Sequence, residues 1–314
     1  MKLLVLAAAF PLLAQRPSEP NPEAEAAALR TLITSAPKLA LTQTQMTISS
    51  PAPGFALDFS SSVTIDRKGT IYLFQRGDKA DPILAVDHQG KVLRSWGKGL
   101  YTIPHSIRVD RDGSIWTVDS GSSKVHHFTA QGKQLLQFDV GEMPEGRSAF
   151  RGANDIAFGR DGLLYISDGY GNARVVVYDR KGNRVRQWGK RGTGPGEFVL
   201  PHGIAIDRDS IVYVADRENG RIQRFHLDGS YIGEWRHLGK TFSISFSPAG
   251  DLWIGTQPRN NANGVGGWLV KVDRSTGKPL GWVETKGHHS IELDTHGEIY
   301  TGARPDLVLW FRKQ

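Results

Sequence analysis

The sequence lacks cysteine altogether, which excludes disulfide bonds and a lipid-modified N-terminal cysteine. After the first 50 of its 314 residues it has no low-complexity linker, so one domain is expected rather than two. It also lacks an apolar run long enough to span a bilayer. The formal net charge is +7, but the basic residues form no runs and are not interleaved with aromatics. The composition therefore favours a solvated basic surface over a nucleic-acid interface.

The N-terminus has the features of an export signal. Lys2, an apolar run from Leu3 to Ala9 and a small residue at Ala14 before Gln15 are typical of a secretory signal peptide. We therefore expect a signal peptide over residues 1–14 and a periplasmic or secreted protein. Residues 15–39 are expected to form a linker, with a short helix in PEAEAAALRTL as the alternative.

A repeat accounts for the rest of the chain. In six places an apolar-x-apolar run precedes a polar turn, at intervals of 40 to 49 residues. The first apolar residues of the six copies are Val63, Ile107, Ile156, Ile204, Ile244 and Ile291. Further runs rich in β-branched and aromatic residues follow in each copy, broken by Gly, Asp and Asn, as in antiparallel strands joined by tight turns. This period suits one four-stranded blade per repeat and predicts an all-β, six-bladed β-propeller over residues 40–314.

The ring needs one more strand to close. The last copy stops before an outer strand could form, since the sequence ends at Gln314. The segment before the first repeat, about Ala40 to Phe59, is available to supply that strand. We therefore expect the propeller to be closed by an N-terminal strand, which leaves no unpaired edge at the junction.

Histidine alternates along the repeats. The residues two before the six anchors are Ser61, His105, Asn154, His202, Phe242 and His289. Alternate blades of a six-fold ring are about 120° apart, so three imidazoles from this position would converge on the axis. Three neutral imidazoles with one open position suit catalytic zinc and other borderline divalent metals. The other seven histidines lie off this position and are expected at the surface or in turns: His88, His126, His127, His226, His237, His288 and His296.

Other polar residues should share the rim with these histidines. The first two strands of a blade are antiparallel, so the end of the second strand returns to the rim where the first began. Arg76 and Arg217 lie there, with Tyr170 one position further along its repeat. The arginines could bind a carboxylate or cap turns, and Tyr170 could be a base or a packed rim aromatic. The aspartates that recur with every second strand, Asp119, Asp168 and Asp216, are assigned to hydrogen bonding in turns.

At this level of detail the sequence resembles the NHL-repeat propellers, and among them the peptidyl-α-hydroxyglycine α-amidating lyases (peptidylamidoglycolate lyases). The resemblance covers all six repeats, from about Val63 to Gln314. The most specific matches are FQRGD (Phe74–Asp78), IPHSI (Ile103–Ile107), SDGYGNARV (Ser167–Val175), PHGIAI (Pro201–Ile206), ADRENGRIQRF (Ala215–Phe225) and HSIELDTHGEIYTG (His289–Gly302).

The resemblance implies a zinc ion held by His105, His202 and His289, with Tyr170 as general base and Arg76 and Arg217 in the active site. It also implies cleavage of the C–N bond of a peptidyl-α-hydroxyglycine, or of a similar N-acyl-hydroxyglycine-like substrate, to an amide and glyoxylate.

One implied feature does not carry over. The family has a carboxylate directly after the third histidine to hold a structural calcium, together with backbone carbonyls at the positions of Val63 and Ile107. This chain has Ser290 where the carboxylate would be, which argues against calcium.

Two other functions remain open. A non-enzymatic NHL-type propeller could bind a protein or glycan on the same face, and it would not need three metal-competent histidines. A calcium-dependent lactonase of the propeller type would hold its metal largely through carboxylates and amides, whereas the central positions here are histidines.

Overall fold

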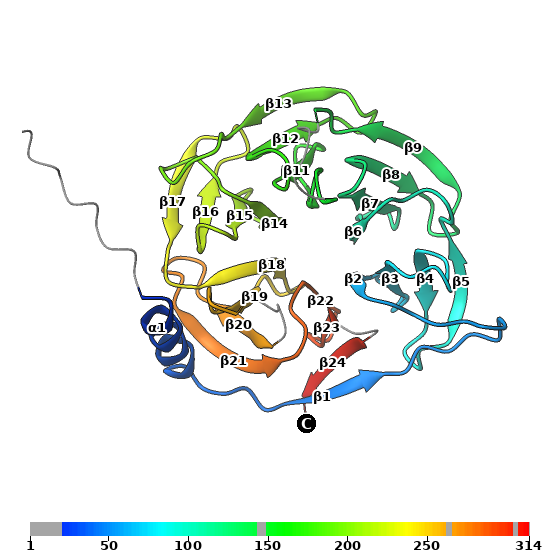
Figure 1. Ribbon diagram of the computed structural model, residues 1–314, viewed down its shortest axis with the longest axis horizontal. Coiled ribbons are helices and arrows are strands. Elements are labelled where there is room, and N and C mark those ends of the chain that lie inside the picture. Colours follow the sequence, from blue (N-terminus) through cyan, green and yellow to red (C-terminus); the bar gives the residue numbers. More distant parts are fainter. Residues whose placement is uncertain (1–20, 143–148, 262–265, 304–306, 314) are drawn as a thin grey trace, which may run out of the picture.

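The computed structural model describes residues 21–142, 149–261, 266–303 and 307–313. The expected signal peptide, residues 1–14, lies outside them. The described chain forms six four-stranded antiparallel sheets arranged around a central axis, so the predicted six-bladed propeller is confirmed (Figure 1). Each predicted anchor residue lies in the innermost strand of its blade.

The strands of the first three blades follow the chain outward from the axis. Blade 1 consists of β2 (Ser60–Ile65), β3 (Ile71–Gln75), β4 (Ile83–Val86) and β5 (Val92–Trp96). Blade 2 consists of β6 (Pro104–Val109), β7 (Ile115–Asp119), β8 (Lys124–Phe128) and β9 (Gln134–Asp139). Blade 3 consists of β10 (Asp155–Phe158), β11 (Leu164–Asp168), β12 (Arg174–Tyr178) and β13 (Arg184–Trp188).

The last three blades include the closure of the ring. Blade 4 consists of β14 (Pro201–Ile206), β15 (Val212–Asp216), β16 (Arg221–Phe225) and β17 (Tyr231–Trp235). Blade 5 consists of β18 (Lys240–Phe246), β19 (Leu252–Gln257), β20 (Gly267–Val272) and β21 (Pro279–Thr285). Blade 6 combines β22 (Ser290–Leu293), β23 (Ile299–Ala303) and β24 (Leu307–Lys313) with β1 (Leu41–Met46) from the other end of the chain.

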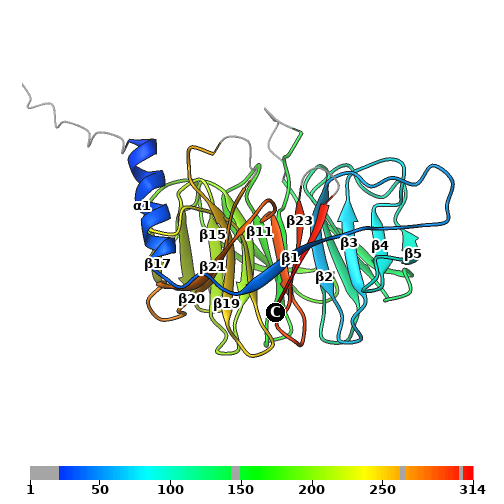
Figure 2. The ribbon, with the colours of Figure 1, turned by 90° about the horizontal axis from the view of Figure 1, so that it is seen from below.

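The closing strand lies where the sequence predicted it. β1 pairs antiparallel with β24, from Leu41 opposite Lys313 to Met46 opposite Val308. Figure 2 shows β1 crossing the side of the propeller next to β24. The N-terminal and C-terminal parts of the chain therefore share one sheet, and no gap is left between the first and last blades.

Residues 22–34, expected as a linker or a short helix, form helix α1 (Pro22–Thr34). The side chain of Asn21 accepts a hydrogen bond from the Glu23 N–H, and Pro22 occupies the first turn, where it costs no hydrogen bond. Leu29 and Ile33 are buried in the apolar cluster between blades 4 and 5, which holds the helix against the outside of the ring (Figure 1). Within the described residues, this helix is too short and too polar to span a bilayer.

The core is divided among the seams between neighbouring blades. Between blades 2 and 3, for example, Trp116 and Val118 of β7 pack against Ile156 of β10 and Ile166 of β11, and all four are fully or almost fully buried. The β-branched and aromatic residues that alternate along each strand supply these two-sided contacts.

The turns between the first and second strands carry a positive φ in every blade. Glycine occupies this position in five blades, as at Gly113 with φ 83°, whereas blade 4 has Ser210 with φ 65°. A residue with a Cβ is strained in this region, so Ser210 is a local departure from the repeat.

Candidate active site

The three alternating histidines meet near the axis of the propeller, at the end where their inner strands begin. His105 and His202 are the second residues of β6 and β14, and His289 directly precedes β22. Strand pairing is irregular at His105 and His202, with register shifts between Pro104 and Ser106 and between Pro201 and Ile204. Such irregularities change the direction in which a side chain points and are frequent beside active sites.

The imidazoles form a nearly equilateral triangle. The ring centroid of His105 is 4.9 Å from those of His202 and His289, and the latter two are 5.0 Å apart. One ring nitrogen from each histidine lies within 4.8 Å of those of the other two. In the described part of the chain this is the one cluster of three or more His, Asp or Glu side chains with metal-ligand spacing.

All three histidines are held in the same way. Each Nδ1 lies 2.7 Å from a backbone carbonyl oxygen of a neighbouring blade: His105 to Asn154, His202 to Phe242 and His289 to Ser61. A carbonyl can only accept, so each Nδ1 carries the proton and each Nε2 keeps its lone pair. Metal-binding histidines are commonly fixed by this kind of hydrogen bond, which sets the tautomer and the ring orientation.

The surroundings keep these imidazoles neutral. Burial lowers the pKa of all three well below the ordinary value for histidine. Protonation of one imidazole would disfavour that of its neighbour, as between His289 and His105, and the positive charges of Arg76 and Arg217 act in the same direction. The three Nε2 lone pairs are therefore available to a metal ion at neutral pH.

Tyr170 lies directly beside the histidines, as expected. Its hydroxyl oxygen is 3.2 Å from Nε2 of His105 and 3.5 Å from Nε2 of His202. Gly169 brings the tyrosine loop close to the ring, because a Cβ there would lie 2.2 Å from the carbonyl oxygen of Pro201. The Gly169 N–H donates to Oδ1 of Asn154 at 2.8 Å. Asn154 therefore holds the tyrosine loop through its side chain and His105 through its backbone.

The two arginines lie on the same rim, each over aromatic rings. The guanidinium carbon of Arg76 is 4.9 Å from the ring centroid of Phe59, and Nε donates to the carbonyl of Pro104 at 2.8 Å. The guanidinium carbon of Arg217 is 4.8 Å from the ring centroid of Phe242 and 5.8 Å from that of Tyr170. Cation–π contacts of this kind fix the plane of a guanidinium while its edge stays available for hydrogen bonds.

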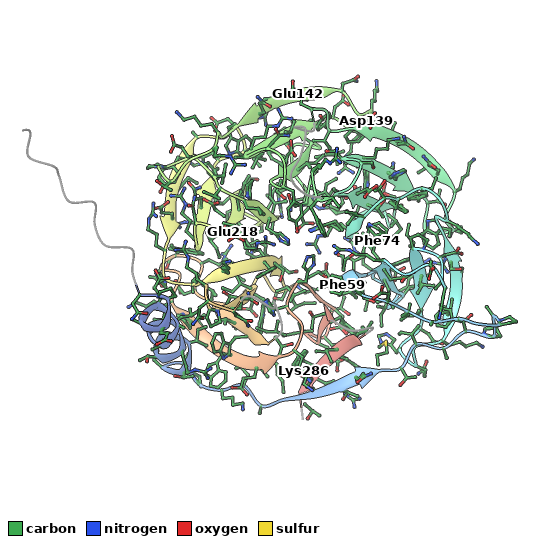
Figure 3. The ribbon with its side chains drawn as sticks, viewed as in Figure 1. Phe59, Phe74, Asp139, Glu142, Glu218 and Lys286 are labelled. Carbon is green, nitrogen blue, oxygen red and sulfur yellow. The ribbon has the colours of Figure 1, made fainter. Side chains whose placement is uncertain are left out.

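Sequence reasoning did not identify Glu218, which is part of this rim. Its Oε1 accepts from Nε of Arg217 at 3.0 Å, and its Oε2 is 2.9 Å from the ammonium of Lys240. Within the described residues, the terminal nitrogens of Arg217 have no hydrogen-bond partner. Figure 3 shows Glu218 and Phe59 on different sides of the centre of the ring. The one available signal was the position of Glu218 directly after Arg217 in ADRENGRIQRF.

Two of the three recurring aspartates hold loops of the rim, as predicted, whereas Asp168 accepts from the side chains of Asn172 and Arg174. Asp119 accepts from the N–H groups of Thr102 and Ile103, at 2.8 and 2.6 Å, just before the strand that carries His105. Asp216 accepts from the N–H groups of Val199 and Leu200, just before the strand that carries His202. Both carboxylates are fully buried, and their hydrogen bonds hold the loops that lead into the histidine strands.

The prediction that the other histidines are surface or turn residues is wrong at two positions. His126 lies in the middle of β8 and His288 directly precedes His289, and both side chains are buried. His288 packs against Phe242, with ring centroids 5.0 Å apart, and its Nε2 lies 3.0 Å from Oε1 of Gln257. The prediction was wrong for these two histidines because the inner and middle strands of a blade are covered on both faces by the neighbouring blades.

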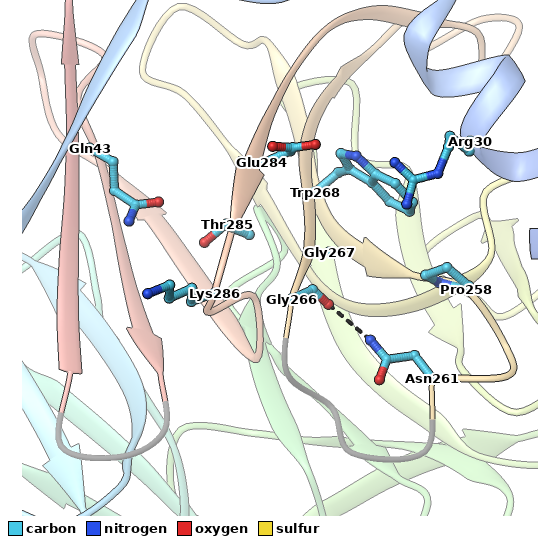
Figure 4. Close-up of a pocket in the computed structure, with 10 residues that line it drawn as sticks. All are labelled: Arg30, Gln43, Pro258, Asn261, Gly266, Gly267, Trp268, Glu284, Thr285 and Lys286. Carbon is cyan, nitrogen blue, oxygen red and sulfur yellow. Dashed lines mark hydrogen bonds between the residues drawn. The ribbon is translucent and has the colours of Figure 1, made fainter.

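A separate pocket of about 510 Å³ lies toward the outside of blade 5 (Figure 4). In this pocket the guanidinium carbon of Arg30, on α1, lies 5.3 Å from the ring centroid of Trp268. Gln43 of β1 and Lys286 line the pocket from the other side. None of the ten residues that line it is a histidine, so it is distinct from the histidine site.

Comparison with known proteins agrees with both the fold and the resemblance. A family model described as a 6-bladed beta-propeller matches residues 153–280. A putative gluconolactonase of known structure covers 90% of this chain and 95% of its own, with a TM-score of 0.64 and 14% identity. At that identity the likeness concerns the fold alone.

Three relatives are similar in sequence. Peptidyl-glycine alpha-amidating monooxygenase of Mus musculus is 31% identical in a match 292 residues long that covers 80% of this chain and 30% of that protein. A probable peptidyl-alpha-hydroxyglycine alpha-amidating lyase of Caenorhabditis elegans is 29% identical over 73% of this chain and 69% of its own. NHL repeat-containing protein 3 of Homo sapiens is 32% identical over 60% of this chain and 59% of its own. The chain thus spans less than a third of the mouse protein.

Proposed function

We propose that this NHL-type six-bladed propeller, which is similar to the amidating lyases, is itself a carbon–nitrogen lyase. Its substrate would be a peptidyl-α-hydroxyglycine or a similar α-hydroxy-amide acid, and its products an amide and glyoxylate. The observation that carries the proposal is the convergence of three imidazoles in one tautomer, with a tyrosine hydroxyl 3.2 Å from one of them. The names of the relatives support the same substrate class.

His105, His202 and His289 fit a divalent metal, and zinc is the ion we propose. Three neutral nitrogen donors with fixed tautomers and an open fourth position are the donor set of catalytic zinc. When bound, zinc would act as a Lewis acid that makes the substrate hydroxyl more acidic. The groups at the implied calcium position do not fit that ion, because Ser290 offers a neutral hydroxyl, which accepts from the Val63 N–H at 2.9 Å, where a carboxylate would be needed.

The arginines would bind and orient the substrate. An α-hydroxyglycine residue carries a hydroxyl, an amide nitrogen and a carboxylate on one carbon atom. Arg217 has terminal nitrogens without a partner in the described residues, and Glu218 and Phe242 hold its guanidinium on the rim. Guanidinium groups bind carboxylates through two parallel hydrogen bonds. We assign the carboxylate to Arg217, with Arg76 adding positive charge from the other side of the histidines.

Tyr170 would transfer the proton. The hydroxyl proton of the substrate would move to Tyr170, which must be present as the phenolate to accept it, and the electron pair of that O–H bond would form the carbonyl of glyoxylate. The C–N bond breaks, and its electron pair leaves with the amide nitrogen. That nitrogen takes up a proton, which Tyr170 can return, so the sum of the products equals the substrate. Tyr170 acts at hydrogen-bond distance from the histidines, where the reacting hydroxyl would lie.

A first test compares metal-free and zinc-reloaded protein with an N-acyl-α-hydroxyglycine. We expect the zinc-reloaded protein to release amide and glyoxylate in equal amounts and the metal-free protein to release neither above the uncatalysed rate. Equal rates for both preparations would contradict the metal dependence.

We further propose that the protein works in the periplasm or outside the cell, where it would meet peptides.

A binding function is the second candidate, because NHL repeat-containing protein 3, whose name states no reaction, is also similar to this chain. A propeller that only binds a protein or glycan would use the same face without chemistry. Two results together would favour it: no glyoxylate release by the wild type, and ligand binding that persists when His105, His202 and His289 are replaced one at a time. A lactonase of the calcium type receives no support, since the described cluster with metal-ligand spacing consists of histidines.

A further inference from the structure

A buried charge network joins the inner strands of blades 2, 3 and 6 close to the histidines. Arg108 of β6 and Glu292 of β22 follow His105 and His289 by three residues, and Asp155 begins β10. The side chains of Arg108, Asp155 and Glu292 are 11%, 6% and 19% exposed. A single guanidinium therefore lies between two carboxylates with little access to water.

Arg108 binds Asp155 through two hydrogen bonds and lies next to Glu292. Its Nη2 is 2.7 Å from Oδ2 of Asp155 and its Nε is 3.1 Å from Oδ1, a bidentate pairing. Its Nη1 is 3.8 Å from Oε2 of Glu292. Arg108 thus connects blade 2 to blades 3 and 6 at once.

The same network reaches the remaining three blades. Thr64 of blade 1 and Ser245 of blade 5 each donate a hydroxyl to Glu292 at 3.4 Å. The N–H of Ile204 in blade 4 donates to Oδ2 of Asp155 at 3.4 Å. Every inner strand of the propeller therefore contacts one of these two carboxylates or contains one of the three charged residues.

The charges depend on one another. Burial lowers the pKa of Arg108, but Asp155 and then Glu292 more than offset this and leave it above the ordinary value. Burial raises the pKa of Glu292, and the charge of Arg108 opposes that shift. Among the six described inner strands the other basic residue is Lys240, which is paired with Glu218 on the rim. Arg108 is therefore the cation that Asp155 and Glu292 share.

At the calcium position implied by the resemblance, serine hydroxyls contact the backbone of neighbouring inner strands. Oγ of Ser290 accepts from the Val63 N–H at 2.9 Å. Oγ of Ser62 accepts from the Ile107 N–H at 3.2 Å and faces the Ile107 carbonyl oxygen at 3.5 Å. Neutral hydroxyls and paired backbone groups are a poor donor set for calcium, which prefers carboxylates in numbers.

We propose that Arg108 is a built-in cation that braces the six inner strands, so that the propeller does not depend on calcium. Removal of its charge leaves Asp155 and Glu292 around the space that the guanidinium filled. Two buried carboxylates, with the hydroxyls of Thr64, Ser106 and Ser245 around them, form an oxygen-rich site. Such a variant should bind a divalent cation that the wild-type chain does not bind there.

The test measures thermal unfolding of zinc-loaded protein in calcium-free buffer and with millimolar calcium. For the wild type we expect melting temperatures within about 1 °C of each other, because a ligand that does not bind the native state adds no stability. For Arg108→Ala we expect a melting temperature lower by roughly 10 °C without calcium, since a buried pair is broken. Calcium should then restore at least about 3 °C of that loss.

Two further variants complete the design. Arg108→Lys keeps a positive charge and should remain insensitive to calcium, whereas Arg184→Ala, at an exposed residue of β13, should behave like the wild type. If Arg108→Ala does not fold, equilibrium dialysis of calcium against the wild type decides. One calcium per wild-type chain, or a wild-type melting temperature that drops when calcium is removed, would overturn the proposal. An unchanged melting temperature in Arg108→Ala would overturn it as well.

Discussion

The Nδ1–H of His289 donates to the backbone carbonyl of Ser61, 2.7 Å away, across the seam where the first and last blades meet. His289 precedes β22 of blade 6, whose outer strand β1 comes from the start of the chain. The orientation of the third imidazole therefore depends on a correctly closed ring. The metal-competent site and the closure of the propeller are parts of the same structure.

Loss of one imidazole should weaken metal binding sharply. In His289→Ala we expect zinc affinity to fall at least about 100-fold, because two nitrogen donors remain of the three. Equilibrium dialysis with elemental analysis measures this directly, and the wild type should hold one zinc per chain. His226→Ala is the matched control, because His226 is exposed in the turn after β16, and this variant should bind zinc like the wild type. Equal zinc affinity in both variants would contradict metal binding by the three histidines.

The metal-free protein should lose stability below about pH 6.5. Burial lowers the pKa of His105, His202, His289 and His126, so the unfolded chain takes up protons at a pH where the folded chain does not. Protons therefore favour unfolding, and each such histidine contributes up to about 1.4 kcal/mol per pH unit. For His288, whose pKa is lowered to about 4, the loss ends near that pH.

Denaturant unfolding at several pH values gives this slope. His126→Phe should flatten it by about one proton, because the imidazole packs between Tyr101 and Phe128 and its nitrogens have no hydrogen-bond partner among the described residues. A free energy of unfolding that does not change between about pH 5 and about pH 6.5 would show that these histidines have the same pKa in the folded and the unfolded chain.

Glu218 should act on substrate binding through Arg217. In Glu218→Gln the guanidinium loses its charged partner at Nε, so we expect KM to rise roughly tenfold with kcat little changed. Steady-state rates of glyoxylate release separate the two constants. Glu284→Gln, at an exposed residue of β21, serves as the matched control. A Glu218→Gln variant with unchanged KM would remove Glu218 from the site.

The turn of blade 4 offers a paired test of backbone strain. Ser210 has φ 65°, whereas the corresponding Gly113 of blade 2 has φ 83° and open space around a potential Cβ. Ser210→Gly should stabilise the protein by about 1 kcal/mol, and Gly113→Ser should destabilise it by a similar amount. Calorimetry of both variants checks the sign, and shifts in the same direction would contradict the explanation.

The repeat and the histidine alternation could be predicted from the sequence because they are periodic. Val63 and its five counterparts mark the inner strand of each blade. Residues at the same position of different inner strands lie at the same level around the axis, so the alternating histidines could be expected to meet there. The partners of the histidines could not be predicted, because His105 is held by a backbone carbonyl of Asn154 and backbone atoms leave no mark in the sequence. Only the fold shows that the same position in the next blade provides it.

Two further features were beyond sequence reasoning for a different reason. Arg108 and Asp155 are 47 residues apart, and neither residue type repeats at its position in the other blades. A pairing between blades at one point of the ring gives no periodic signal. Helix α1 was one of two alternatives for its segment, and the deciding contacts of Leu29 and Ile33 are made with blades far along the chain.

The most direct measurement is glyoxylate release from an N-acyl-α-hydroxyglycine by zinc-loaded wild type and Tyr170→Phe side by side. Tyr170 is the one hydroxyl found at 3.2 Å from the ring of a tripod histidine among the described residues. We expect release by the wild type and a fall of roughly 100-fold or more in kcat for Tyr170→Phe, with zinc still bound. No release from folded, zinc-containing wild type, or equal rates for both proteins, would contradict the lyase mechanism.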